Sequence, residues 1–244
     1  MADIESRRNP EIRRVKLLLD NAAQRKTDRT FVCHGSVALS EAIKSGAEIK
    51  TVYALDKKGL PDGIETKTVS AEVLELISGV ENSRDVVFTV CFPASRPFKG
   101  KKFIALCSVR DPGNVGTVIR TADAFGMDGV VLVGSCADPF SPKTVRSTAG
   151  SLFRVPLFFM TADGLRSECE KNKIDLYAAE LSDGAERLCG GALKTGCVMI
   201  GNEAHGLSDE EISAAHKRIM IPIKSAESLN AAVAAAVFMW EMSR

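Results

Sequence analysis

A series of short apolar runs in the second half of the chain constrains the fold most. Each run is bounded by turn-forming residues and is separated from the next by a segment with helical periodicity. Near-continuous apolar runs that alternate with helices predict a parallel sheet covered on both faces. The expected strands are 103–109, 129–133, 174–178, 197–200 and 219–223. The sequence therefore predicts an α/β fold for this part of the chain.

The front part of the chain indicates a second, smaller α/β unit. Asn9 and Pro10 are predicted to cap and open a first helix, and helices are expected to begin at Ser36 and Ser70. The expected strands of this unit are 30–33, 49–54 and 86–92. The stretch 93–102 contains two prolines, a glycine and several basic residues, which is typical of a linker. We therefore expect domains at 1–92 and 103–244, joined by a linker at 93–102.

Composition excludes several classes of protein. The 244 residues contain no apolar run of about 18 residues that could span a membrane, so no membrane partner is expected. The first nine residues lack the apolar core of a secretory signal, which predicts a cytoplasmic location. Seven cysteines without a C-x-x-C pair, together with only three histidines, indicate reduced thiols and no metal site.

The net charge of +1 does not decide whether the chain binds nucleic acid, because the local field matters more. In the first thirty residues, basic side chains outnumber acidic ones by 8 to 5. The arginines lie largely off the apolar stripe of the first predicted helix, which leaves a basic face free for a partner. The alternative is an ordinary solvated charged surface.

The stretch 109–126 joins an expected strand to an expected helix through the turn Asp-Pro-Gly-Asn. Such a loop places free backbone N–H groups, Asn114 and Arg120 near the carboxyl end of a strand, where open α/β sheets bind ligands. Taken alone, an ordinary turn between a strand and a helix is the alternative. A dinucleotide-binding dehydrogenase is excluded because the stretch has no G-x-G-x-x-G pattern.

Two later stretches, 143–152 and 200–230, share this unusual content of glycine and polar residues at strand ends. In their order and spacing, the three stretches resemble the three motifs of the SpoU (TrmH-like) family of SPOUT-superfamily RNA ribose 2′-O-methyltransferases. The resemblance covers 103–244. The front part resembles the ribosomal-protein-like RNA-binding domain that many members carry, through S-x-x-N-P at 6–10 and R-T-F-V-C-H-G at 29–35. His34 departs from the acidic residue that is common there.

The resemblance implies a C-terminal parallel-sheet SPOUT domain with a deep trefoil knot, which general connection rules would not suggest. It further implies S-adenosylmethionine as the cofactor, bound within the knot, and a homodimer formed through the C-terminal domain. The cofactor-binding positions carried over are Gly201, Ile221 and Leu229. The catalytic positions carried over are Asn114, Arg120, Glu203, Ser228 and Asn230.

Arg120 matches a residue that family members use to activate the 2′-hydroxyl or to hold the adjoining phosphate. A guanidinium is always protonated, so we expect it to stabilise the developing oxyanion and the phosphate rather than to act as a base. Glu203 could orient Arg120 or accept the proton. Asp123, three residues after Arg120, is the candidate partner for a purely structural ion pair. His205 is expected to face solvent.

The predicted function is 2′-O-methylation of a ribose in structured RNA, with ribosomal RNA as the expected substrate and transfer RNA as the alternative. A non-catalytic RNA-binding protein of the same fold is the rival hypothesis, and the five intact catalytic positions argue against it. The last helix is apolar almost all round, which indicates burial either in the core of its own domain or in a subunit interface.

Overall fold

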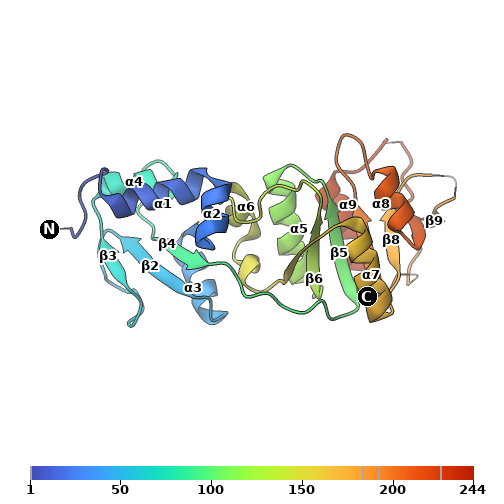
Figure 1. Ribbon diagram of the computed structural model, residues 1–244, viewed down its shortest axis with the longest axis horizontal. Coiled ribbons are helices and arrows are strands. Elements are labelled where there is room, and N and C mark those ends of the chain that lie inside the picture. Colours follow the sequence, from blue (N-terminus) through green and yellow to red (C-terminus); the bar gives the residue numbers. More distant parts are fainter. Residues whose placement is uncertain (1, 183, 192, 226) are drawn as a thin grey trace. The chain divides into compact units, whose positions relative to one another are not determined.

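The computed structural model describes residues 2–182, 184–191, 193–225 and 227–244. Its internal contacts divide the chain into two compact units (Figure 1). The front unit consists of Met1–Ala94 with Asp138–Phe153, and the second unit consists of Ser95–Ala137 with Arg154–Arg244. The chain first passes from one unit to the other inside the predicted linker.

The front unit contains a four-stranded sheet in the order β1-β4-β2-β3. β4 pairs antiparallel with β1 and β2, and β3 pairs parallel with β2. Helices α1 and α4 pack over one face, where their apolar side chains meet Val32, Tyr53 and Val87. The bounds are Pro10–Asp20 (α1), Thr30–His34 (β1), Ile49–Ala54 (β2), Thr66–Thr68 (β3), Ala71–Ser78 (α4) and Val87–Cys91 (β4).

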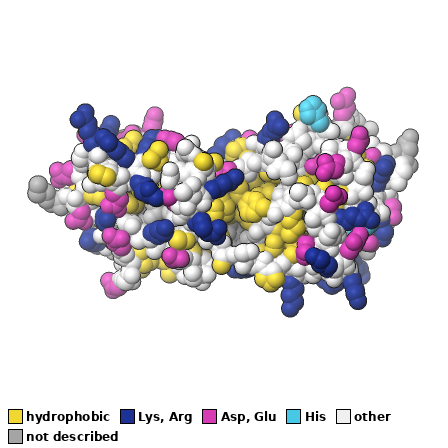
Figure 2. Space-filling model, in the orientation of Figure 1, with side chains coloured by type: hydrophobic (Ala, Val, Ile, Leu, Met, Phe, Trp, Pro, Cys, Tyr) yellow, Lys and Arg dark blue, Asp and Glu magenta, His cyan; other side chains and the backbone are white. Residues whose placement is uncertain are grey.

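Capping residues fix where these helices begin. The Asn9 side chain accepts a hydrogen bond from the backbone N–H of Glu11, and Pro10 is the first helical residue, as the sequence predicts. Asn21 ends α1 and caps a separate helix, α2 (Ala22–Asp28), which the sequence analysis missed. Figure 2 shows Lys and Arg side chains spread over the viewed face of this unit, with acidic side chains between them.

A segment from the second half of the sequence covers the other face of this sheet, beside α3 (Ser36–Lys44). It contains α6 (Pro142–Thr148) and the short 3-10 helix Ser151–Phe153. The ring of Phe31 lies 5.1 Å from that of Phe140 and 6.2 Å from that of Phe153, measured between centroids. Burial of these rings explains why residues 138–153 belong to the front unit, so the second unit is not the continuous 103–244 segment that the sequence predicts.

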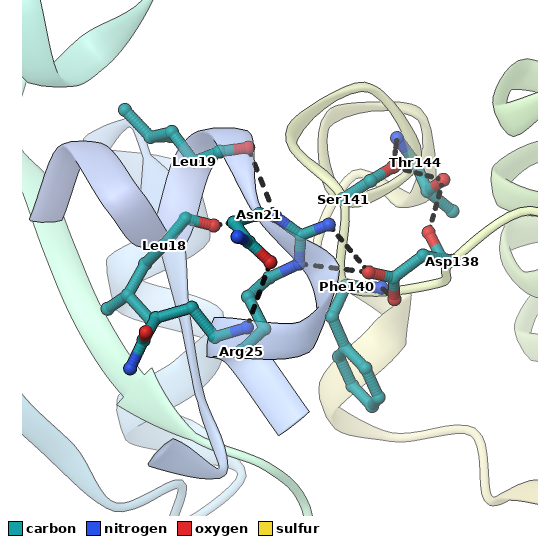
Figure 3. A network of polar contacts seen from close by, with 9 residues as sticks. Leu18, Leu19, Asn21, Arg25, Asp138, Phe140, Ser141 and Thr144 are labelled. Atoms are coloured by element: carbon teal, nitrogen blue, oxygen red, sulfur yellow. Dashed lines mark hydrogen bonds and ion pairs between the residues drawn. The ribbon is translucent and has the colours of Figure 1, made fainter. Parts of the chain in front are cut away.

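A buried ion pair also holds this segment (Figure 3). Arg25 is only 4% exposed, and its Nε and Nη2 donate to Asp138 Oδ2 at 2.9 and 2.7 Å. Its Nη1 donates to the backbone carbonyls of Leu18 and Leu19. Arg25, one of the eight basic residues counted in the first thirty, is therefore part of the packing of the front unit.

The second unit contains a seven-stranded sheet in the order β7-β6-β5-β10-β8-β11-β9, and every pair in it is parallel. This confirms the predicted α/β architecture. The strands are Lys102–Cys107 (β5), Gly129–Val133 (β6), Leu157–Met160 (β7), Leu176–Ala179 (β8), Glu186–Arg187 (β9), Gly196–Ile200 (β10) and Lys217–Met220 (β11).

Helices cover both faces of this sheet. α7 (Ala162–Asn172) and α8 (Asp209–Ala214) pack over one face, and α5 (Pro112–Ala124) packs with α9 (Ala231–Ser243) on β5, β6 and β10. One side of α9 is buried through Phe238 and Met239, whereas Val233 and Trp240 are 50% and 54% exposed. Within the described residues, no helix is long and apolar enough to cross a membrane.

Several predicted boundaries are wrong by a few residues. β11 ends at Met220 and not at residue 223, because Pro222 has no N–H to donate to the ladder. β5 ends at Cys107, before Ser108 turns to a φ of +54°. α9 begins after Asn230 and not near Ser228, because the Asn230 side chain accepts from the backbone N–H groups of the first turn. The sequence analysis missed the strands β3, β7 and β9, because they are too short to show the apolar pattern of a strand.

All seven cysteines are free, as the sequence predicts for reduced thiols. Burial raises the pKa of the Cys33 and Cys107 thiols well above the ordinary value, which keeps them protonated and unreactive.

Candidate functional site

A cavity of about 290 Å³ lies in the second unit, at the carboxyl ends of the neighbouring strands β10, β8 and β11. The segment that leads into α9 and the inner side of α9 complete its walls. The three predicted cofactor-binding residues line it, as do two of the predicted catalytic residues: Gly201, Ile221, Leu229, Glu203 and Ser228. These five residues all come from the stretch 200–230 and lie together at one cavity.

Gly201 begins a loop that folds tightly back on itself. The backbones of Asn202 and Gly206 exchange two hydrogen bonds, at 3.0 and 2.9 Å. A Cβ atom on Gly201 would lie 2.2 Å from the carbonyl carbon of Gly206, which no real contact allows. The loop itself thus requires glycine at this position.

Three predicted catalytic residues form a chain of hydrogen bonds, which we call the Asn114 network. Asn114 Nδ2 donates to Glu203 Oε1 at 2.7 Å, and Asn230 Nδ2 donates to Asn114 Oδ1 at 3.2 Å. The three side chains come from the first turn of α5, the loop after β10 and the cap of α9. Both ends of the Asn114 amide are engaged, so its orientation is fixed.

Helix caps hold the members of this network in place. Asp111 caps α5 by accepting a hydrogen bond from the backbone N–H of Asn114 at 2.9 Å, and Pro112 is the first helical residue. Asn230 uses its Oδ1 to accept from Ala232 and Val233, which leaves its Nδ2 for Asn114. Helix-capping residues therefore position the site.

Arg120 is exposed on α5, and its side chain makes no hydrogen bond or ion pair with the described residues. It lies six residues after Asn114, which places it roughly 120° around the helix from that side chain. Asp123 does not pair with it, because Arg154 Nη2 lies 2.6 Å from the Asp123 carboxylate. Glu203 is oriented by Asn114 and not by Arg120. The structure therefore does not bring Arg120 into the Asn114 network.

Two further residues at this site escaped the sequence analysis. Asn202 Nδ2 donates to the carbonyl of Ser108 at 2.8 Å, which ties the loop after β10 to the end of β5. Glu180 follows β8 directly and lines the cavity. A carboxylate just after an apolar run is a signal that could have identified Glu180. His205 is exposed on its loop, as expected.

The stretch 143–152 lies in the front unit and contains none of the predicted site residues. Near it, Nε2 of the half-buried His34 lies 2.7 Å from Ser83 Oγ, and burial lowers the pKa of this imidazole. Over the ranges that the structure describes, no group of three or more His, Cys, Asp or Glu residues could hold a metal ion.

Comparison with known proteins identifies the family. Residues 101–240 match the SpoU rRNA Methylase family. The chain belongs to this family. Membership confirms the expected enzyme class, an RNA methyltransferase that uses S-adenosylmethionine.

SpoU relatives match the chain over almost its whole length. The 23S rRNA (guanosine(2553)-2′-O)-methyltransferase RlmP of Bacillus subtilis is 30% identical over 247 residues, which cover 99% of each chain. The 23S rRNA (uridine(2479)-2′-O)-methyltransferase of Streptomyces viridochromogenes is 29% identical, over 97% of this chain and 90% of its own. Among solved structures, the crystal structure of an AdoMet-bound rRNA methyltransferase from Sinorhizobium meliloti matches with a TM-score of 0.86. The match covers 98% of this chain and 97% of that one, with 30% sequence identity.

Proposed function

We propose that this SpoU chain transfers the methyl group of S-adenosylmethionine to a ribose 2′-hydroxyl of ribosomal RNA. The observation that carries the proposal is the Asn114 network, whose member Glu203 also lines the cavity at the strand ends. Ribosomal RNA is preferred over transfer RNA because the full-length relatives from Bacillus and Streptomyces are both named for 23S rRNA.

The cavity suits the cofactor. Its lining is largely aliphatic, and loops that follow three parallel strands offer it backbone N–H and C=O groups. This combination is usual for a nucleoside site in an open α/β sheet. We assign Gly201, Ile221 and Leu229 to hold the cofactor. When bound, S-adenosylmethionine supplies an electrophilic methyl group, so the protein has mainly to place and activate the acceptor hydroxyl.

Glu203 is the carboxylate of the Asn114 network and therefore the candidate to accept the proton of the 2′-hydroxyl. Asn114 holds it by donating a hydrogen bond, and Asn230 in turn donates to Asn114. Ser228 lines the cavity and is exposed, so it is a candidate to bind a reacting group there. Arg120, with a guanidinium that the described residues leave unpaired, stabilises the oxyanion and the neighbouring RNA phosphate.

The α5–α9 surface supports the proposed homodimer. A groove of about 490 Å³ runs along these helices and is lined by apolar residues that include Phe125, Val233 and Trp240. Figure 2 shows hydrophobic side chains gathered where α5 lies in Figure 1. Asn114 and Asn230 also line the groove, so dimerisation would border the catalytic network.

We further propose that the segment after β11 forms the trefoil knot. This segment lines the cavity beside the loop after β10, and α9 then returns to pack on β5 and β10. Residues 103–244 are proposed to carry the methyltransferase function, in the cytoplasm.

Residues 1–92 are proposed to bind the substrate RNA. Arg8 and Arg13 support this role, since both are exposed and, within the described ranges, their guanidinium groups have no hydrogen-bond or ion-pair partner. Arg14 instead pairs with Asp28 at 2.6 Å, and Arg7 approaches Glu72 at 3.7 Å.

The test is single-turnover transfer of labelled methyl from S-adenosylmethionine to ribosomal RNA or transfer RNA, followed by digestion to nucleosides. We expect label in a 2′-O-methylnucleoside from ribosomal RNA. Label in transfer RNA alone would favour the alternative substrate. RNA binding without any transfer would favour the non-catalytic hypothesis.

A further inference from the structure

Glu180 is a carboxylate at the cofactor cavity that neither the sequence motifs nor the Asn114 network accounts for. It is the first residue after β8, and its side chain is 21% exposed. Its Oε2 is buried and has no hydrogen-bond partner among the described residues. Its Oε1 lies 3.7 Å from Arg218 Nη1. Ser182 Oγ, two residues further on, is likewise buried and unpaired.

The buried, unpaired Oε2 of Glu180 needs a hydrogen-bond donor. Buried polar atoms in native proteins are hydrogen-bonded in the large majority of cases, and each exception needs an explanation. An ionised carboxylate can only accept hydrogen bonds, so the missing group is a donor. Because Glu180 lines the cavity, a ligand bound there can supply the donor for its carboxylate.

The chemistry of the site narrows the choice of donor. S-adenosylmethionine carries ribose hydroxyls, an adenine amino group and an α-ammonium group. Arg218 already offsets part of the charge of Glu180, which weakens its attraction for a second cation. A carboxylate close to the carboxyl end of a parallel strand is a usual partner for ribose hydroxyls.

We propose that Glu180 accepts hydrogen bonds from the ribose hydroxyls of the adenosyl group and so fixes the cofactor in its cavity. The inference rests on the proposed function, since it assigns a residue to one part of the ligand. Glu180 therefore discriminates against adenosyl compounds that lack these hydroxyls, and it acts on cofactor affinity rather than on the methyl transfer itself.

The test is calorimetric titration of the full chain with three unreactive ligands. S-adenosylhomocysteine has all three kinds of donor, 5′-methylthioadenosine lacks the ammonium group, and the 2′,3′-dideoxy form of 5′-methylthioadenosine also lacks the hydroxyls. Glu180→Gln is compared with wild type and with Glu186→Gln, an exposed carboxylate on β9 that does not line the cavity. Melting temperatures are measured on the same samples.

We expect Glu180→Gln to weaken binding of S-adenosylhomocysteine and 5′-methylthioadenosine alike, by about tenfold or more, as for loss of a charge-assisted hydrogen bond. Binding of the dideoxy compound should be unchanged by the substitution, and Glu186→Gln should bind all three ligands like wild type. Wild type itself should bind the dideoxy compound about tenfold more weakly than its parent. This comparison needs no variant and therefore holds even if Glu180→Gln folds poorly.

Three results would overturn the proposal. Unchanged affinity for every ligand would exclude any contact, and weakening of S-adenosylhomocysteine alone would assign Glu180 to the ammonium group. Equal weakening of the dideoxy compound would assign it to the adenine. If wild type bound no S-adenosylhomocysteine, the proposed function itself would fail, and that result differs from all three.

Discussion

At the scale of single residues, the site depends on side chains whose hydrogen-bonding capacity is used to different degrees. Asn114 has both ends of its amide engaged, by Glu203 and by Asn230. Arg120 has five donors and, among the described residues, no acceptor for any of them. Because Asn114 is held in place, it is suited to orient a reacting group beside it. An unpaired cation on a helix surface suits an anionic partner from outside the chain.

Replacing Arg120 by Lys or Ala should cut methyl transfer by about a hundredfold or more, the usual effect of losing an oxyanion donor. Lys should perform little better than Ala because an ammonium cannot make the planar two-pronged contact to phosphate. Stability should change by less than about 1 kcal/mol, since no ion pair is lost. Single-turnover transfer and melting temperature measure both quantities, with the exposed Arg187→Ala as a control. An active Arg120→Lys enzyme would refute the role.

Replacing Gly201 by Val should abolish cofactor binding and lower the melting temperature, because its Cβ would collide with the backbone at Gly206. Gly184→Ala is the matched control, since a Cβ there meets no atom within 4 Å. Calorimetry with S-adenosylhomocysteine measures the binding. RNA affinity should persist if the front unit supplies it. Normal cofactor affinity in Gly201→Val would contradict this prediction, because it would show that the loop can rearrange without losing the cofactor site.

At the scale of elements, α9 serves two environments at once. Its inner side is buried against the sheet, and its outer side exposes Val233 and Trp240 beside α5. The apolar composition that looked uniform in the sequence therefore has two causes. The two causes can be told apart only from what packs against each side of the helix. The spacing of apolar residues within the helix does not contain that information.

Trp240→Glu should weaken dimerisation by placing a charge on the proposed interface. Sedimentation of the full chain measures the effect. Leu17→Glu is the matched control, because Leu17 is an apolar residue exposed to a similar degree, 50% against 54% for Trp240, but lies on α1. We expect monomers only for Trp240→Glu, with reduced transfer, since Asn114 and Asn230 border the same groove. A dimeric Trp240→Glu protein would place the interface elsewhere.

The segment 138–153 is the second element with an unexpected role. Asp138→Asn would remove one charge of a pair whose other member, Arg25, is 4% exposed. Leaving a buried charge unpaired should lower the free energy of unfolding by about 3 kcal/mol, measured by urea titration. Asp20→Asn breaks the exposed pair with Lys16 and should change it by less than about 1 kcal/mol. Equal effects would contradict a structural role for the buried pair.

Much of the fold follows from local pattern, but its long-range pairings do not. The strand Ile49–Ala54 and the caps at Asn9 and Ser70 were predictable because the causes lie within a few residues. The packing of Phe140 on Phe31 joins residues more than a hundred positions apart, and no periodicity records it. The motif resemblance named Asn114, Glu203 and Asn230, and the structure joins these three side chains by hydrogen bonds. The resemblance missed Glu180 and Asn202. Glu180 stands out only because it lines the cavity, and Asn202 only because it bonds to the carbonyl of Ser108.

At the scale of the whole molecule, the two compact units do not correspond to a simple division of the sequence. An isolated 103–244 fragment would contain residues 138–153 without Phe31 and Arg25, their packing partners in the front unit. Phe140 and Phe153, both less than 10% exposed in the full chain, would then face water. Oligomeric state and cofactor affinity are therefore best measured on the full chain.

The most direct test of the account is a map of ribose methylation across all RNA from cells with and without this gene. Resistance of each phosphodiester to alkaline hydrolysis reports the 2′-O-methyl group. We predict that one ribosomal RNA nucleotide loses its methyl group without the gene, and that the wild-type gene restores it while Arg120→Ala does not. An unchanged ribosomal RNA map, or a loss confined to transfer RNA, would contradict the account.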